Sequence, residues 1–205
     1  MEERFIALFF SLWIKLFFVL TPFFALTMFL TLTEGYEAAR RRRLALNVSV
    51  TVAAISLLLF FAGRQMFSLF GITLDSFRIG AGVLLLLSGI GLVHGKTVTS
   101  GGASDGDVAV VPLAIPIIVG PATTGTLLVL GAEMTAIADK TVGCLALLAA
   151  VASIATVLLA GSFIQRCLGA RGISIISKLT GLVLAALAAQ MIMTGIQSFM
   201  NAANK

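Results

Sequence analysis

The stretch DVAVVPLAIPIIVGPATTG, residues 107–125, decides how this chain folds. It is apolar over most of its length, yet it holds three of the chain's four prolines. Each proline removes a backbone donor and obstructs the carbonyl four residues earlier, so a regular helix is interrupted here. Unpaired backbone groups at membrane depth are tolerated only where protein buries them or where they line a wet cavity. The stretch therefore predicts a broken membrane helix whose break is functional.

The rest of the chain supports a membrane setting. Of its 205 residues, 59% are hydrophobic and 11% are charged, whereas soluble domains carry about 25% charged residues. A membrane helix needs about 20 apolar residues, and the apolar runs are too long and too continuous for the strands of a membrane barrel. The sequence predicts an all-α membrane protein with six spans: Phe5 to Leu32, Leu44 to Phe61, Phe77 to Val93, Val108 to Leu130, Val142 to Phe163 and Leu179 to Met200.

The fourth proline, Pro22, interrupts the first span next to Thr21. Its place in the first half of the chain corresponds to the proline-rich break in the second half, so the two breaks together predict one solute site. The hydroxyls of Thr21 and Thr27 either contact the solute or satisfy carbonyls freed by the kink, and the sequence leaves both open. The predicted substrate-binding residues are Thr21, Pro22, Thr27, Pro116, Gly120, Pro121, Ala122, Thr123 and Thr124.

Lys15 is a charge inside the first span, where an ammonium is costly and indicates function by default. No acidic residue lies inside a predicted span as a partner for it. Binding of a substrate carboxylate and a contact to the carbonyls of a broken helix both remain open. Arg78 follows Asp75 by three residues, which predicts a local ion pair. Gln190 is predicted to hydrogen-bond to a neighbouring helix.

The two halves of the chain resemble each other. Each begins with a proline-interrupted span, continues with an uninterrupted one and ends with a glycine-rich one, and FRIGA at 77–81 aligns weakly with SKLTG at 177–181. Because each half has three spans, a repeat would be inverted, as in many transporters. We predict a single transmembrane domain over residues 1–205, with a first repeat at 1–94, a linker at 95–107 and a second repeat at 108–205.

Basic residues predict the orientation. The side that carries the connections after the first, third and fifth spans holds eight lysines and arginines, including Arg40 to Arg43, and the other side holds five. The side richer in lysine and arginine is normally cytoplasmic. We therefore expect the cytoplasmic (inner) membrane, both termini outside, and no nucleic-acid partner for the arginine run. Cys144 and Cys167 have no metal-like spacing and read as free thiols.

At these segments the chain resembles the MarC family of integral membrane proteins. Residues 107–121 are similar to that family's D-I-A-x-V-P-L-A-I-P-x-x-x-G-P signature. The segments at 70–82 and 181–196 are similar to its F-G-I…F-R-I-x-G-G and G-L-L…Q-M-I…G-I stretches. The first span departs from the family's N-P-x-G-x-x-P pattern, because Thr21, Phe24 and Thr27 replace its Asn, Gly and second Pro. The first break should therefore be milder.

The resemblance implies six helices, a relation to the LysE-type exporter superfamily and movement of small neutral amino acids such as alanine or glycine. We predict a secondary transporter or exporter that works by alternating access. It would need no cofactor, and its coupling ion would be Na⁺ or H⁺. Its partners would be the lipid bilayer, a small neutral amino acid and, in a homo-oligomer, further copies of the chain. No H-E-x-x-H, G-x-S-x-G or Walker motif is present, which argues against an enzyme or a primary pump. The alternative is a non-transporting membrane scaffold or lipid-interacting protein.

Overall fold

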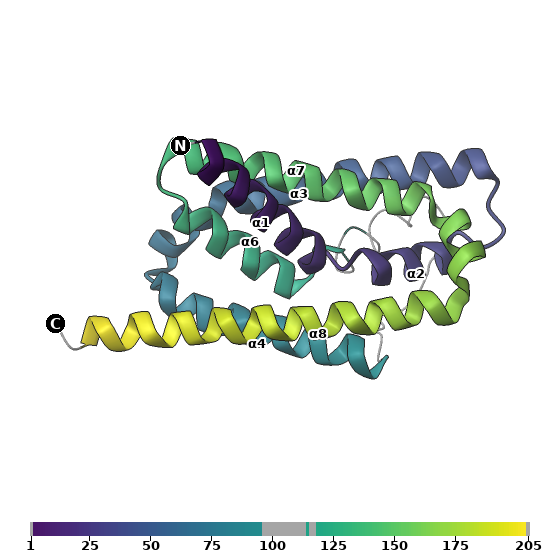
Figure 1. The fold of residues 1–205 in the computed structure, drawn as a ribbon. Helices are drawn as coiled ribbons and strands as arrows, with labels where there is room; N and C mark the ends of the chain where they lie inside the picture. The colour runs from purple at the N-terminus through teal and green to yellow at the C-terminus, as the bar shows by residue number, and fades with distance from the viewer. Residues whose placement is uncertain (1, 96–113, 115–117, 204–205) are drawn as a thin grey trace.

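The computed structural model describes residues 2–95, 114 and 118–203, and the regular structure of this part is helical throughout (Figure 1). The predicted all-helical class is confirmed there. The helices are α1 (Glu2–Val19), α2 (Pro22–Leu32), α3 (Ala38–Phe70), α4 (Leu74–His94), α6 (Pro121–Glu133), α7 (Ile137–Leu159) and α8 (Gly161–Ala203).

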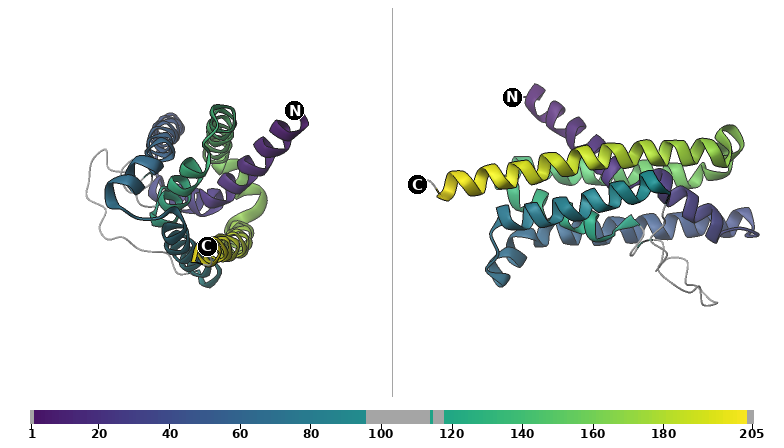
Figure 2. Two further views of the ribbon diagram at one scale, coloured as in Figure 1. Left: turned by 90° about the vertical axis from the view of Figure 1, so that its left-hand side faces the viewer. Right: turned by 90° about the horizontal axis from the view of Figure 1, so that it is seen from below.

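The helices form an elongated bundle with two distinct ends (Figures 1 and 2). Both termini lie at one end, together with the α3–α4 and α6–α7 turns; we call it the terminal end. The α2–α3 and α7–α8 connections lie at the opposite end, which we call the arginine end because Arg40 to Arg43 begin α3 there.

Four of these helices are long and apolar enough to cross a membrane, and α1 with α2 makes a fifth candidate span that is bent by 40°. Only 28–39% of the most apolar window of each of the four is buried inside the protein. Their outer faces therefore present apolar side chains to the surroundings, as lipid contact requires. The fourth predicted span, Val108 to Leu130, corresponds to α6, which has 13 residues. Most of the stretch that precedes α6 in this span lies outside the described residues.

Two predicted boundaries were wrong. The second span was predicted to begin at Leu44, but α3 begins at Ala38 and includes the arginine run, because arginine is a good helix former and hydropathy marks only the membrane-embedded part. The predicted spans leave residues 164–178 as a connection, but α8 is helical from Gly161 through this stretch, with one interruption at Gly169 (φ 64°). Glycine adopts this left-handed conformation at no steric cost.

The first break changes the backbone hydrogen bonds at the end of α1. Pro22 has no N–H to give to the carbonyl of Phe18, and the N–H of Thr21 donates to that carbonyl instead, at 3.0 Å. Thr21 adopts left-handed backbone angles (φ 49°, ψ 57°), which are unfavourable for a β-branched residue. The predicted interruption near Thr21 and Pro22 is therefore present, and it leaves the carbonyl of Val19 outside the helical ladder.

Glycines set how closely the helices approach. A Cβ on Gly131 of α6 would coincide with the backbone carbonyl of Phe60 on α3, and one on Gly63 of α3 would coincide with that of Leu128 on α6. On the other side of the bundle, Gly89 of α4 and Gly181 of α8 each lie against the backbone of the other helix. Small residues allow such close packing of membrane helices, so α6 is held directly on the α3 backbone.

Arg41 ties three elements together at the arginine end. Its guanidinium donates to the hydroxyl of Ser162 on α8 at 2.8 Å and to the carbonyl of Thr33, the C-cap of α2, at 3.0 Å. Arg40, in contrast, lies 4.3 Å from the ring centroid of Tyr36 and is exposed. One arginine of the run therefore stabilises the fold.

Candidate functional site

The second break lies at Gly120 and Pro121. Gly120 is extended (φ −81°, ψ −179°), Pro121 is the first residue of α6, and the N–H of Thr124 donates to the Gly120 carbonyl at 2.9 Å. Just before the break, the N–H of Val119 donates to Ala114 five residues earlier, at 3.0 Å, which is a wider turn than that of an α-helix. The predicted break in the proline-rich stretch is therefore present, and the half-helix α6 begins at Pro121.

Thr123 brings the two breaks together. Its hydroxyl lies 3.1 Å from the carbonyl oxygen of Ile118, at the second break, and 3.3 Å from that of Val19, at the first break. The side chain is buried, with 4% of its surface exposed. A threonine hydroxyl has one hydrogen and can donate to only one acceptor at a time. The junction therefore holds two backbone acceptors and a single side-chain donor.

A cavity of about 200 Å³ lies next to this junction, on the side of the terminal end, between α1, α4, α6 and α8. Val19 forms part of its wall, so the cavity reaches the residue whose carbonyl meets Thr123. Its apolar lining comes from Val19, Leu85, Val129, Leu130, Leu187 and Met191, and its polar lining from Lys15, Arg78, Thr126, Glu133, Gln190 and Thr194. A small volume whose wall is half polar suits a small polar ligand, below the size of a drug molecule.

A charge network joins α4 to the end of α6 in the cavity wall. Arg78 of α4 pairs with Asp75 at 3.0 Å, as the sequence predicted, and also with Glu133, the last residue of α6. Arg78 is only 9% exposed. Two carboxylates thus neutralise the guanidinium, and hydrogen-bonded pairing of this kind is what a buried arginine requires.

Lys15 projects from α1 into the same cavity. It lies one helical turn before Val19 and is partly buried. In the part of the chain that the structure describes, no carboxylate lies within ion-pairing distance of its ammonium. Lys15 is therefore the cation of this cavity that no described acidic residue neutralises.

None of the eight predicted substrate-binding residues that the structure describes lines the cavity, and half of them lie at the junction next to it. Thr21, Pro22, Ala122 and Thr123 are buried there, and Ala122 packs in one apolar cluster with Val19. The remaining four described residues lie farther out. Gly120 and Thr124 are partly buried, Pro121 is exposed, and Thr27 is exposed with its hydroxyl donating to Phe23 of its own helix at 3.0 Å; Pro116 lies outside the described residues.

The place of several polar residues in the cavity was not foreseen, among them Glu133 and Gln190. Glu133 follows the apolar run that ends at Leu130, and its partner Arg78 is distant in sequence, so neither hydropathy nor local spacing indicated it. Gln190 lines the cavity and its side chain is exposed there, whereas a hydrogen bond to a neighbouring helix was predicted. The sequence did contain one indication of this role for Gln190, because a polar residue inside a predicted membrane span often faces a cavity.

The chain is similar to known membrane proteins over most of its length. Residues 6–200 match the family model described as MarC family integral membrane protein. The chain is 34% identical over 191 residues to a UPF0056 membrane protein of Methanocaldococcus jannaschii, covering 89% of this chain and 93% of that one. It is 31% identical to YvbG of Bacillus subtilis over 193 residues (90% and 92%) and 30% identical to YhcE of Escherichia coli over 198 residues (92% of each), both named UPF0056 membrane proteins.

No solved structure matches the chain. The family model spans nearly all of the sequence, including the two breaks, α4 with Arg78 and α8 with Gln190. The chain therefore belongs to the MarC family of integral membrane proteins.

Proposed function

We propose that this protein is a secondary transporter of small neutral amino acids, of the alanine or glycine type, that works by alternating access across the cytoplasmic membrane. One observation carries the proposal: a polar cavity inside a membrane protein leads to the point where two broken helices meet at Thr123. Irregular backbone at membrane depth is stable where it lines such a cavity, and secondary transporters commonly place their substrate there. The proposal assigns no catalytic chemistry to the chain.

The architecture we propose is six spans in two inverted repeats, residues 1–94 and 108–205. Three features support it. Pro22 and Pro121 begin the half-helices α2 and α6, which leave the middle of the bundle in opposite directions. Gly71, between α3 and α4, and Gly169, at the interruption within α8, both have positive φ. In addition, α6 packs on α3 and α4, while α2 packs on their counterparts α7 and α8.

The junction also suggests how a coupling ion could be held. The carbonyl oxygens of Val19 and Ile118 share one hydroxyl donor, so at any moment one of them is without that hydrogen bond and can coordinate a cation. Unwound backbone carbonyls hold Na⁺ in other transporters. We propose this pair as the ion-contact point and place the arginine end in the cytoplasm, on the basis of the basic-residue excess there.

The experiment is solute counterflow in proteoliposomes with labelled alanine and glycine. We expect the wild type to exchange at least one of them, and we expect Thr123→Val to reduce exchange strongly because it removes the shared donor. Thr31→Val is the matched control, since Thr31 is exposed and bonds only to Thr27 of its own helix. Absence of counterflow with both solutes would remove the substrate assignment and favour a non-transporting membrane scaffold.

A further inference from the structure

We propose that Lys15 makes this cavity a binding site for the carboxylate group of a small organic acid. The inference deepens the proposed function and rests on it for the rest of the substrate, which would be an amino acid. It makes Lys15 the residue that determines specificity for a carboxylate over a neutral or cationic head group.

The balance of charge in the cavity is the first argument. Three charged side chains line it: Lys15, Arg78 and Glu133. Arg78 is engaged by Asp75 and Glu133, whereas Lys15 has no carboxylate partner among the described residues. Lys15 is therefore the one charged side chain of the described cavity wall that forms no ion pair, although Asp75 and Glu133 together carry one negative charge more than Arg78 neutralises. A carboxylate is the ligand group that pairs most strongly with an ammonium at low dielectric.

The depth of Lys15 is the second argument. Helix α1 begins at Glu2, so Lys15 lies about 20 Å along the helix axis from that end, at 1.5 Å per residue. The bend and α2 separate it from the arginine end. A lysine side chain cannot span such a distance to reach a membrane surface. An intramembrane ammonium at this depth needs a wet cavity or an anionic partner, and the cavity supplies the place for both.

The remaining polar groups suit the other end of an amino acid. The hydroxyls of Thr126 and Thr194 donate to carbonyls of their own helices, at 2.9 and 2.8 Å. Their hydrogens are thereby used, and their oxygens remain as acceptors for a substrate ammonium. Glu133 binds Arg78 through one carboxylate oxygen, which leaves its other oxygen as a further acceptor. The apolar wall formed by Val19, Leu85 and Leu187 suits a short aliphatic side chain.

The test measures ligand binding to the purified full-length protein by thermal stabilisation, with alanine, propionate and alaninamide as probes. Alaninamide has the alanine side chain and ammonium but no carboxylate. We expect alanine and propionate to stabilise the wild type and alaninamide to have no effect. Lys15→Met should weaken alanine and propionate binding about ten- to a hundredfold, the usual cost of losing a charged hydrogen bond. Lys15→Arg should retain binding, which separates loss of charge from misfolding.

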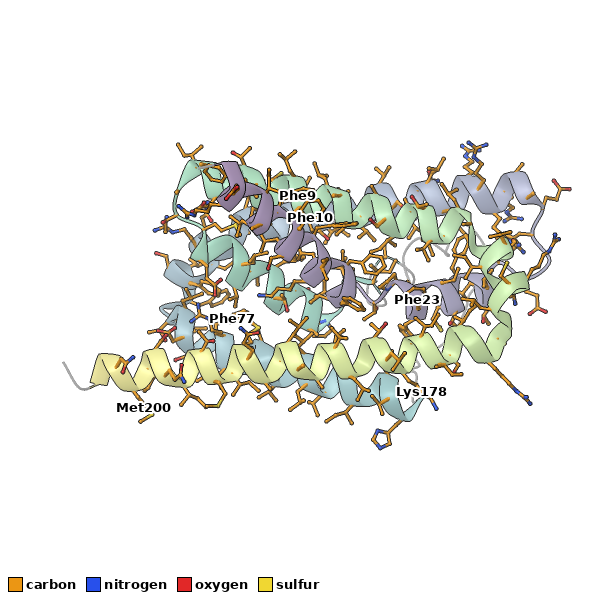
Figure 3. All side chains as sticks on the ribbon, in the orientation of Figure 1. Phe9, Phe10, Phe23, Phe77, Lys178 and Met200 are labelled. Atoms are coloured by element: carbon orange, nitrogen blue, oxygen red, sulfur yellow. The ribbon has the colours of Figure 1, made fainter. Side chains whose placement is uncertain are left out.

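Lys140→Met is the matched control, because it makes the same substitution at a lysine of α7 outside the cavity lining. The exposed Lys178 of α8 is left unchanged (Figure 3). Equal alanine affinity in the wild type and Lys15→Met, or equal binding of alanine and alaninamide to the wild type, would overturn the inference and leave transport standing. Propionate binding that depends on Lys15, without any alanine counterflow, would support the site and remove the amino acid substrate. Stabilisation by none of the carboxylates would overturn both.

Discussion

The half-helices α2 and α6 begin in the same way, with a proline at their first position in the middle of the bundle, but their surroundings differ. Of the 13 residues of α6, ten are buried, and two close approaches to α3 hold it in place. Only four of the 11 residues of α2 are buried, and its threonines Thr27 and Thr31 are exposed. The described cavity is accordingly built with α1 and α6, the half-helices on the terminal side of the breaks.

The C-terminal ends of the two half-helices differ as well: the end of α6 is held by an ion pair, whereas the described residues make none at the end of α2. Glu133 at the end of α6 pairs with buried Arg78 of α4. In the proposed repeat alignment Glu34, just after α2, corresponds to Glu133, and Lys178 of α8 corresponds to Arg78. Both Glu34 and Lys178 are exposed, and no ion pair joins them. An alternating-access protein needs two states in which its repeats exchange roles, so we interpret this asymmetry as one of those states.

The largest effect should come from the glycine contact that only α6 has. Gly131→Ala would push a Cβ into the Phe60 carbonyl, and backbone cannot move aside cheaply, so we expect a loss of 4 kcal/mol or more, on the order of the most severe substitutions. Size-exclusion chromatography of the detergent-solubilised protein should show little folded material. The matched change in α2, Thr27→Ala, should leave the elution profile and Tm unchanged. Normal folding of Gly131→Ala would show that α6 is no more constrained than α2.

The second prediction concerns the unpaired charges. In the second state, in which we expect Glu34 and Lys178 to approach each other, Glu34→Lys would place two cations together. We therefore expect transport to fall at least tenfold, while the Tm of the state described here stays the same. The double variant Glu34→Lys/Lys178→Glu restores opposite charges and should restore transport. Counterflow in proteoliposomes measures both. If the single variant transports normally, the two halves of the molecule do not exchange roles through this pair.

Thr123 and Thr27 give a third test, on stability. Thr123→Val leaves the carbonyls of Val19 and Ile118 without their shared donor, and a buried unsatisfied group costs about 1–3 kcal/mol. Thr27→Val removes only a bond within α2 at an exposed position and should cost less than about 0.5 kcal/mol. Thermal unfolding compares the two, and Thr123→Ser should recover most of the loss. Equal destabilisation by both valine variants would contradict a special role for the junction.

The sequence predicted the membrane class, the break at Pro22 and the family, because apolar length, proline and an ordered motif are local signals. It did not orient α2, because the polar residues within PFFALTMFLTL are Thr27 and Thr31, whose hydroxyls bond to carbonyls of their own helix. A threonine satisfied in this way can face either the protein or the lipid. It also missed Glu133, whose significance depends on Arg78 of a distant helix. Contacts between helices that are far apart in sequence were beyond reach without an alignment.

The smallest predicted effect separates the two breaks themselves. Glycine would be expected to provide the special conformation, yet Gly120 has ordinary extended angles and Thr21 has the left-handed ones. Thr21→Gly should therefore gain about 1 kcal/mol, the lower range for a strained residue. Gly120→Ala should change stability by no more than about 0.5 kcal/mol. A loss of Tm in Thr21→Gly would show that the threonine side chain contributes more than its backbone costs.

Arg41 has a practical consequence for anyone who wishes to reverse the insertion of this protein in the membrane. The usual approach replaces an entire basic run, on the assumption that its members are interchangeable charges. Here Arg41 also clamps the end of α2 and the start of α8 through Thr33 and Ser162, so removing it would alter assembly together with orientation. An orientation experiment that neutralises Arg40, Arg42 and Arg43 and keeps Arg41 would change the topological signal while leaving this clamp intact.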